Sequence, residues 1–139
     1  MACILVIDDE SLLREEAVET LSRDGHDVFH AADGNEAMKV IRTRPIEIIV
    51  TDIIMPAMNG FDVIREVRRE FDHLRDVRII AMSNGGMIAN PAIFLDQSER
   101  FGADYLLPKP FSLEQLRTAI TSVLADPPRQ AEPQCVAGQ

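Results

Sequence analysis

Five side chains with the chemistry of a phosphoryl-binding site are spread along this 139-residue sequence. They comprise three carboxylates, one hydroxyl and one ammonium group: Asp8, Asp9, Asp52, Ser83 and Lys109. If the three carboxylates lie together, each raises the pKa of the others unless a cation lies between them. Mg²⁺ suits such a cluster, because it binds one or two carboxylates and fills its octahedron with carbonyl, water and phosphate oxygens. The three acids are therefore candidate magnesium ligands.

The other two groups favour a phosphoryl group as the ligand. A metal ion, the Lys109 ammonium and the Ser83 hydroxyl together match a trigonal group that carries charge on three oxygens. Asp52 would then be the nucleophile and would form an acyl phosphate. The simpler interpretation is that residues 8–10 form only a solvated turn with acids at a helix N-terminus. We favour the functional interpretation, because Asp52, Ser83 and Lys109 also fall at the ends of predicted strands.

Short apolar segments that alternate with amphipathic ones define the elements that must position these residues. Strands are predicted at 4–7, 28–31, 46–51, 77–82 and 105–107, and helices at 11–25, 35–42, from Gly60, at 92–100 and from Ser112. This alternation predicts an α/β fold, a doubly wound parallel sheet of five strands with five helices covering both faces. Such sheets bind ligands at the carboxyl ends of their strands, where the candidate residues lie.

Two helix starts carry capping signals. Ser11 is predicted to be the N-cap of the first helix, and Ser112 with Gln115 three residues later forms a capping box. The last helix is predicted to bury one apolar stripe, which consists of Leu113, Leu116, Ile120, Val123 and Leu124.

Residues 1–125 are predicted to form one domain. Residues 126–139 consist largely of Pro, Gln, Ala and Gly without an apolar period, so we expect a disordered C-terminal tail that holds no second domain. Cys3 and Cys135 are expected to be free thiols in a reducing compartment.

The net charge of −9 disfavours nucleic acid and anionic lipid as partners, since both carry negative charge. No apolar run approaches the roughly 20 residues of a membrane span. The N-terminus also lacks the features of a signal peptide, so we expect a cytoplasmic location.

Four segments together resemble the motifs of CheY-like receiver domains of response regulators, over residues 3 to about 125. They are Val6–Glu10, Val50–Gly60 with its Met-Pro and Asn-Gly pairs, Ala81–Ser83, and Gly102–Asp104 followed by Pro108–Phe111. The resemblance implies a flavodoxin-like strand order of 2-1-3-4-5 and phosphorylation of Asp52. It also implies that Asp9, Asp52 and the Ile54 backbone carbonyl bind Mg²⁺ directly, while Asp8 helps through water.

The resemblance implies further roles at the same site. Ser83 would move toward the phosphoryl group, and Lys109 would pair with it. The Lys109–Pro110 peptide would be cis, a form whose energy is close to that of the trans form only before proline. The implied donor is a sensor histidine kinase or a histidine phosphotransfer protein. We expect a single-domain regulator that acts through a downstream protein target, as a monomer or a phosphorylation-dependent dimer. Its chemistry would be self-phosphorylation and self-dephosphorylation, so it would not be a conventional enzyme.

One position departs from the family pattern. Receiver domains often have an aromatic switch residue three places before the lysine, where this chain has Leu106. Tyr105 cannot substitute, because neighbours on a strand face opposite sides. We therefore hypothesise that switching involves residues 84–91, which include two glycines, and the fourth helix.

Three alternatives compete with the receiver interpretation. The chain could be a phosphorylation-independent interaction module, although its acidic cluster is complete. An aspartyl phosphohydrolase of the haloacid dehalogenase type needs Asp-x-Asp, but Ile54 stands at the second position. A flavodoxin-like flavin carrier needs a phosphate-binding loop after the first strand, where Asp8, Asp9 and Glu10 would repel phosphate.

Overall fold

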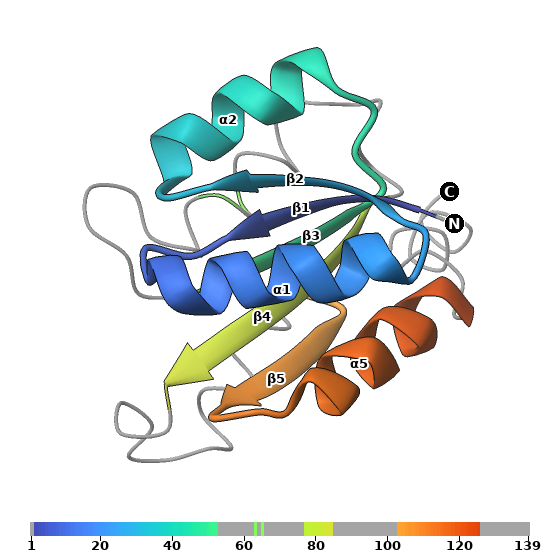
Figure 1. Cartoon of the computed structure of the whole chain (residues 1–139). Coiled ribbons are helices and arrows are strands. Elements are labelled where there is room, and N and C mark those ends of the chain that lie inside the picture. The colour runs from blue at the N-terminus through green and yellow to red at the C-terminus, as the bar shows by residue number, and fades with distance from the viewer. Residues whose placement is uncertain (1, 53–62, 64, 66–76, 85–102, 126–139) are drawn as a thin grey trace, which may run out of the picture.

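A computed structural model describes residues 2–52, 63, 65, 77–84 and 103–125. The described residues form one sheet of five parallel strands in the order β2-β1-β3-β4-β5 (Figure 1). The strands are β1 (Cys3–Ile7), β2 (Asp27–Ala31), β3 (Ile48–Asp52), β4 (Arg78–Asn84) and β5 (Tyr105–Lys109). The predicted α/β class and strand order are confirmed.

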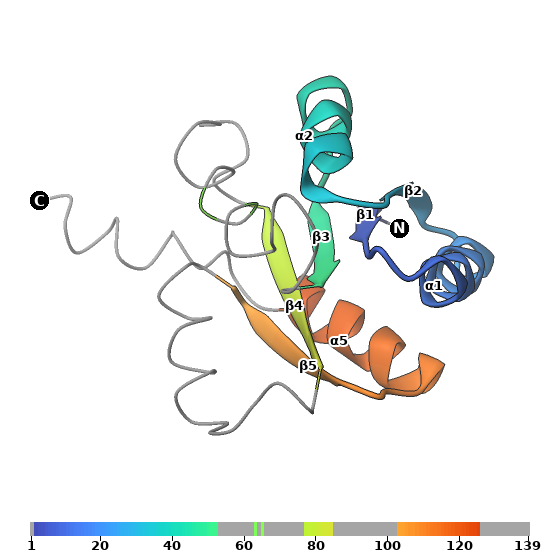
Figure 2. The same ribbon diagram turned by 90° about the vertical axis from the view of Figure 1, so that its left-hand side faces the viewer.

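Three helices belong to the described residues, α1 (Ser11–Arg23), α2 (Gly34–Thr43) and α5 (Leu113–Ala125). Helices α1 and α5 cover one face of the sheet and α2 covers the other (Figure 2). Of the helix predicted from Gly60, the structure describes only Val63 and Arg65, and both are helical. The helix predicted at 92–100, the hypothesised switch loop beyond residue 84 and the predicted tail lie outside the described residues. Within the described part of the chain, no helix has the length and apolar composition that a membrane span requires.

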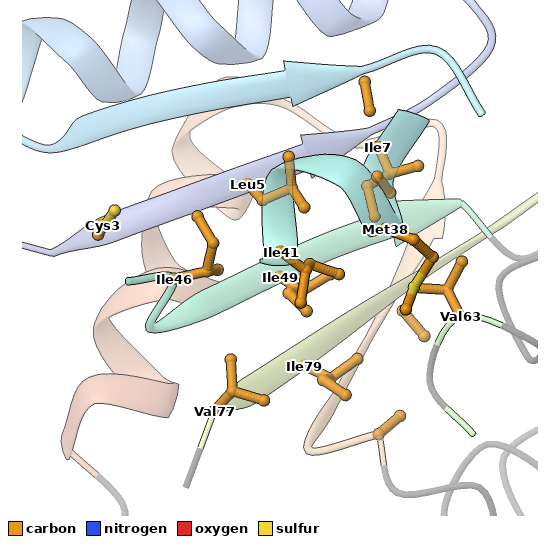
Figure 3. Close-up of a cluster of buried hydrophobic side chains, with 14 residues drawn as sticks. Cys3, Leu5, Ile7, Met38, Ile41, Ile46, Ile49, Val63, Val77 and Ile79 are labelled. Carbon is orange, nitrogen blue, oxygen red and sulfur yellow. The ribbon is translucent and has the colours of Figure 1, made fainter. Parts of the chain in front are cut away.

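Apolar side chains alternate between two cores, one on each face of the sheet. The core beneath α2 includes Leu5, Ile7, Ile41, Ile49 and Ile79 (Figure 3). The core beneath α1 and α5 includes Ile4, Val6, Leu21, Val50, Ile80 and Leu116. All residues of β1 and β3 are buried, as expected for central parallel strands that are covered on both faces.

The two cores also show where the side chains of Leu106 and Tyr105 lie, at the position where the sequence departs from the family pattern. Leu106 packs against the core beneath α2, whereas Tyr105 packs against the core beneath α1 and α5. The predicted opposite orientation of these neighbours is confirmed, so the Tyr105 ring does not occupy the face on which Leu106 lies.

The strands that lead to the site reach further than predicted. Strand β4 continues through Asn84 rather than ending at Met82, and β5 continues through Lys109 rather than ending at Leu107. The register pairs Asn84 with Lys109, so the two strands support each other to their last residues. Lys109 therefore projects from a strand rather than from a loop.

The capping predictions had different outcomes. The capping box before α5 is confirmed, because the Gln115 amide donates to Ser112 Oγ at 3.1 Å and the Ser112 amide donates to Gln115 Oε1 at 2.8 Å. The prediction for Ser11 is wrong. Glu10 is the N-cap and makes no side-chain capping bond, while Ser11 is the first helical residue. The turn before α1 is instead closed by Asp8, whose Oδ1 accepts from the Glu10 amide at 2.9 Å.

The predicted buried stripe of α5 is partly wrong. Leu116, Ile120 and Val123 are buried, and Ala119 completes their face. Leu113 is 38% exposed and Leu124 is 45% exposed. Both lie near the helix ends, and Leu124 follows Val123 by 100° of helical rotation, which turns it away from the sheet.

A side-chain contact fixes the start of β5 against β4. Asp104 Oδ2 accepts from the Ile79 amide at 2.8 Å, and the Asp104 amide donates to the Ile79 carbonyl at 2.7 Å. Ile79 is fully buried, so its amide needs this acceptor. The contact sets the register that carries β5 toward Lys109.

We expect Asp104→Ala to lower the free energy of unfolding by about 1–3 kcal/mol, because it leaves a buried amide without an acceptor. Asp104→Asn keeps a carbonyl oxygen at the same place and should lose clearly less. Urea unfolding followed by circular dichroism measures both variants. Equal losses would show that the charge of Asp104, rather than its acceptor oxygen, stabilises this end of the sheet.

Candidate functional site

Three carboxylates meet at the carboxyl ends of the central strands. Asp8 and Asp9 follow β1, and Asp52 is the last residue of β3, whose Thr51 pairs with Ile7 of β1. One carboxylate oxygen of each acid lies within 4.8 Å of the corresponding oxygens of the other two. Asp8 is fully buried and Asp52 is 6% exposed, whereas Asp9 is open to solvent. The structure thus brings together the three acids that sequence analysis placed at this edge.

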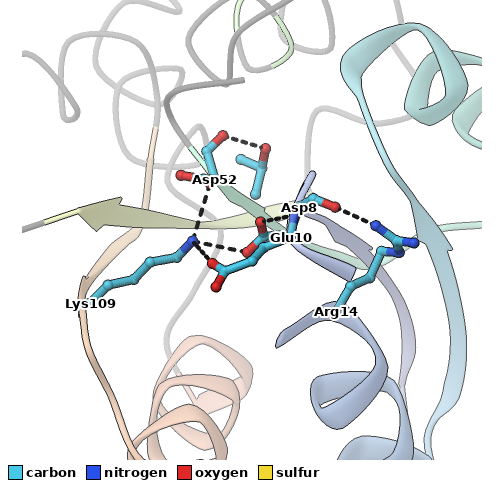
Figure 4. A network of polar contacts seen from close by, with 6 residues as sticks. Asp8, Glu10, Arg14, Asp52 and Lys109 are labelled. Atoms are coloured by element: carbon cyan, nitrogen blue, oxygen red, sulfur yellow. Dashed lines mark hydrogen bonds and ion pairs between the residues drawn. The ribbon is translucent and has the colours of Figure 1, made fainter. Parts of the chain in front are cut away.

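Lys109 reaches into the acidic cluster from the end of β5. Its Nζ donates to Asp8 Oδ2 at 3.0 Å and to Asp52 Oδ2 at 3.1 Å (Figure 4). The same Nζ lies 3.7 Å from Glu10 Oε1. The Lys109–Pro110 peptide is cis, as the family resemblance implied. One ammonium group therefore bridges two buried carboxylates that come from different strands.

The protonation of Lys109 follows from these contacts. Burial opposes the charge on the ammonium, but the hydrogen bonds and negative charges of Asp8 and Asp52 outweigh burial and raise the Lys109 pKa above its ordinary value. A raised folded-state pKa means that the stabilisation is complete below the unfolded value of about 10.4. It is lost only when the pH rises through the folded-state pKa, so the lysine stays charged at neutral pH.

The other two predicted site residues are placed less completely. Ser83 lies in β4, where its backbone pairs with Pro108 of β5, one residue beyond the pairing of Met82 with Asp52. Its backbone thus lies at the same edge of the sheet as Asp52 and Lys109. Ile54 lies outside the described residues, so its carbonyl as a metal ligand stays a prediction.

The residues of the cluster are suitable ligands for Mg²⁺. The cluster offers only carboxylate oxygens as donors, which are the ligands that this hard cation prefers. The acids are held in place by neighbours: the Asp8 amide donates to the Ala31 carbonyl at 3.2 Å, and Thr51 Oγ1 donates to the Asp52 carbonyl at 3.0 Å. Asp8, Asp9 and Asp52 could therefore hold the ion without a large rearrangement of the strands.

Two residues that contact the cluster were not predicted from the sequence. Glu10 lies near the Lys109 ammonium, and Arg14 Nη1 donates to the Asp8 backbone carbonyl at 2.7 Å. A signal for Arg14 was present, because helical side chains point toward the helix N-terminus. A long side chain one turn into α1 therefore reaches back to the turn that carries Asp8 and Asp9.

Comparisons with known proteins agree on one family. The family model described as response regulator receiver domain matches residues 4–121. Among solved structures, the chemotaxis response regulator CheY4 of Vibrio cholerae has a TM-score of 0.80 and 29% sequence identity, covering 88% of this chain and 98% of that chain. A response regulator receiver domain protein from Clostridium thermocellum has a TM-score of 0.74 and 28% identity, covering 89% of this chain and 94% of that chain.

Curated relatives are longer than this chain. The probable transcriptional regulator ycf27 of Porphyridium aerugineum is 37% identical over 121 residues, which cover 87% of this chain and 47% of that protein. The response regulator MprA of Mycolicibacterium vanbaalenii is 35% identical over 121 residues, which cover 87% of this chain and 49% of that protein. The chain thus spans about half the length of the curated relatives it matches.

The lysine contacts predict how stability depends on Mg²⁺. Lys109→Met keeps most of the stem but leaves Asp8 and Asp52 facing each other, so the metal-free variant should lose about 1–3 kcal/mol of unfolding free energy. Added Mg²⁺ can balance the same carboxylates and should stabilise this variant more than the wild type. Thermal unfolding with and without Mg²⁺ measures both effects.

Lys39→Met is the matched control, because Lys39 is an exposed lysine on α2. It should respond to Mg²⁺ as the wild type does. A Lys109→Met variant with unchanged stability and an unchanged Mg²⁺ response would show that the ammonium does not balance the cluster.

Proposed function

This chain belongs to the response regulator receiver domain family of two-component systems, and we propose that its Asp52 accepts a phosphoryl group with the help of Mg²⁺. Receiver domains interact with histidine kinases or phosphotransfer proteins, and the proposed donor is the phosphohistidine of such a partner. The observation that carries the proposal is the 3.1 Å contact between Lys109 Nζ and Asp52 Oδ2 inside a cluster of three carboxylates.

Asp52 has the placement that a nucleophile needs. Its carboxylate is nearly buried, ends a central strand and is fixed through Oδ2 by Lys109. In the proposed step, a carboxylate oxygen of Asp52 bonds to phosphorus while the phosphorus–nitrogen bond of the donor histidine breaks. The electron pair of that bond stays on the imidazole, and the product is an acyl phosphate on Asp52.

The neighbouring residues would prepare this step. Asp8, Asp9 and Asp52 would hold Mg²⁺, with the Ile54 carbonyl as a further expected ligand. When bound, Mg²⁺ neutralises charge on the phosphoryl oxygens. The Lys109 ammonium would turn from the carboxylates to the phosphoryl group, and the Ser83 hydroxyl would approach it from β4. The Lys109 ammonium, which holds the resting cluster, would thus become a donor to the new anion.

Phosphorylation would control a protein contact. The phosphoryl group adds about 1.5 to 2 negative charges and three acceptor oxygens at one edge of the sheet. Lys109 and Ser83 belong to β5 and β4, so a shift of either residue changes the surface around these strands. A downstream protein that binds one of the two surfaces better would receive the signal. In this proposal the protein modifies only its own aspartate and is not a conventional enzyme.

A phosphorylation-independent interaction module is the second candidate function. It shares the receiver fold, so the two candidates differ only in whether Asp52 reacts. The contacts of Lys109 with two buried carboxylates, which raise its pKa, favour a reactive site, because a passive module has no need to bury these charges.

Intact-mass measurement after acetyl phosphate treatment tests the proposal. The wild type should gain one phosphoryl group when Mg²⁺ is present and none when Mg²⁺ is chelated. Asp52→Asn should gain none, because its amide is not a nucleophile. Glu16→Gln removes an exposed carboxylate from α1 and should behave as the wild type does. A wild type without an adduct, or an adduct that survives in Asp52→Asn, would favour the interaction module.

The switching hypothesis makes a separate prediction. With Leu106 packed against the core beneath α2, we expect the response to beryllofluoride and Mg²⁺ to concentrate in residues 84–100. Hydrogen–deuterium exchange of the peptides that cover this segment should change, whereas peptides from β2 and α2 should not. Equal exchange with and without beryllofluoride across residues 84–100 would reject this route.

A further inference from the structure

The start of α1 is secured in an unusual way. Its N-cap, Glu10, makes no side-chain capping bond, so the turn between β1 and α1 lacks the usual tie to the helix. Arg14 supplies one instead. Its Nη1 donates to the Asp8 carbonyl at 2.7 Å (Figure 4). This contact adds to the ordinary helical bond from the Arg14 amide to the Glu10 carbonyl. The Arg14 side chain therefore ties the acidic turn back to α1.

Asp8 has a partner for each of its polar groups. Its amide donates to Ala31, its Oδ1 accepts from the Glu10 amide, its Oδ2 accepts from Lys109, and its carbonyl accepts from Arg14. Of these four bonds, the one with Arg14 joins Asp8 to α1. The first two hold the turn against β2 and close it locally, and the third restrains only the carboxylate.

The Asp8 carbonyl also controls Asp9. This carbonyl belongs to the planar peptide group that links Asp8 to Asp9, so its direction sets where the Cα of Asp9 lies. Asp9 is the exposed member of the cluster. A bond that fixes this peptide group therefore restrains the backbone position from which the Asp9 carboxylate reaches a cation.

The guanidinium of Arg14 is partly withdrawn from water. The side chain is half-buried, and its Nε is shielded from solvent without a hydrogen bond to any residue that the structure describes. A charged donor in such surroundings makes a stronger bond to a carbonyl than it would on an open surface. Burying a donor without a partner is costly, which argues against Arg14 being an ordinary solubilising residue.

We propose that Arg14 is a positioning residue for the magnesium site, which holds the Asp8–Asp9 peptide group in the orientation that lets both carboxylates face the ion. The inference rests on the proposed function. A purely electrostatic role would have the opposite sign, because a positive charge near the cluster repels Mg²⁺ and its removal would tighten binding. The direction in which the Mg²⁺ affinity changes when Arg14 is replaced therefore distinguishes a positioning role from an electrostatic one.

The test compares Mg²⁺ affinity among full-length variants by isothermal titration calorimetry. Arg14→Met keeps the apolar stem but removes the donor, and we expect its Mg²⁺ dissociation constant to rise about tenfold, as when a group that orients a metal ligand is lost. Arg14→Lys keeps a charged donor of similar reach and should recover most of the wild-type affinity. Arg14→Gln, which is shorter and neutral, should resemble Arg14→Met and provides a second route if Arg14→Met folds poorly.

Arg23→Met is the matched control. Arg23 lies on the same helix, and its replacement by Met removes the same positive charge as Arg14→Met does. Its guanidinium, however, pairs with Glu19 at an exposed position. Its Mg²⁺ affinity should equal that of the wild type. A second measurement, hydrogen–deuterium exchange of residues 8–14 in metal-free protein, should show faster exchange in Arg14→Met than in Arg23→Met. This readout does not depend on phosphorylation.

The outcomes separate the two proposals. A wild type that binds Mg²⁺ and accepts the phosphoryl group, together with Arg14→Met that binds Mg²⁺ equally well or more tightly, would overturn the role of Arg14 and leave the proposed function intact. Unchanged exchange of residues 8–14 in Arg14→Met would overturn it as well. A wild type that binds no Mg²⁺ would overturn the proposed function and the inference that rests on it.

Discussion

The balance of charge between one ammonium and three carboxylates is the constraint on which the rest of this structure depends. Parallel strands deliver Asp8, Asp9 and Asp52 to one edge of the sheet, where their charges repel. The Lys109 Nζ lies 3.0–3.1 Å from two of these acids and offsets that repulsion. A divalent cation or a phosphoryl group that binds to this cluster changes the charges around Lys109, so the lysine can exchange its carboxylate contacts for new ones.

The sheet supplies the rigidity that this balance requires. Strands β1 and β3 are buried on both faces, so Asp8 and Asp52 are held at the ends of strands that packing constrains on both sides. Lys109 arrives from β5, at the edge of the sheet, and its placement depends on the register between β4 and β5. Asp104 helps to fix that register at the far end of β5 through its contacts with Ile79. A motif residue remote from the acidic cluster thus contributes to the geometry of the lysine.

The turn after β1 is the less constrained side of the site. It carries the exposed Asp9, and α1 begins beyond it without a side-chain cap. The contacts of Asp8 with Glu10 and Arg14 hold this turn in place. The site therefore combines carboxylates fixed by strands with one carboxylate whose direction depends on a helix, and the receiver fold unites the two through the packing of α1 against β1 and β2.

Local patterns in the sequence were sufficient for the fold class, because apolar runs of β-branched residues and amphipathic segments report secondary structure directly. They were also sufficient for the convergence of Asp8, Asp9, Asp52 and Lys109, since parallel strands carry their carboxyl ends to one edge. The strand order came from family resemblance and not from local pattern. Only the tertiary structure decided three further features. They are the contacts of Arg14 and Glu10, the position of the N-cap at Glu10 instead of Ser11, and the exposure of Leu113 and Leu124. Those features depend on how far a side chain reaches and on how a helix lies across the sheet, and such distances between remote segments leave no periodic signal in the sequence.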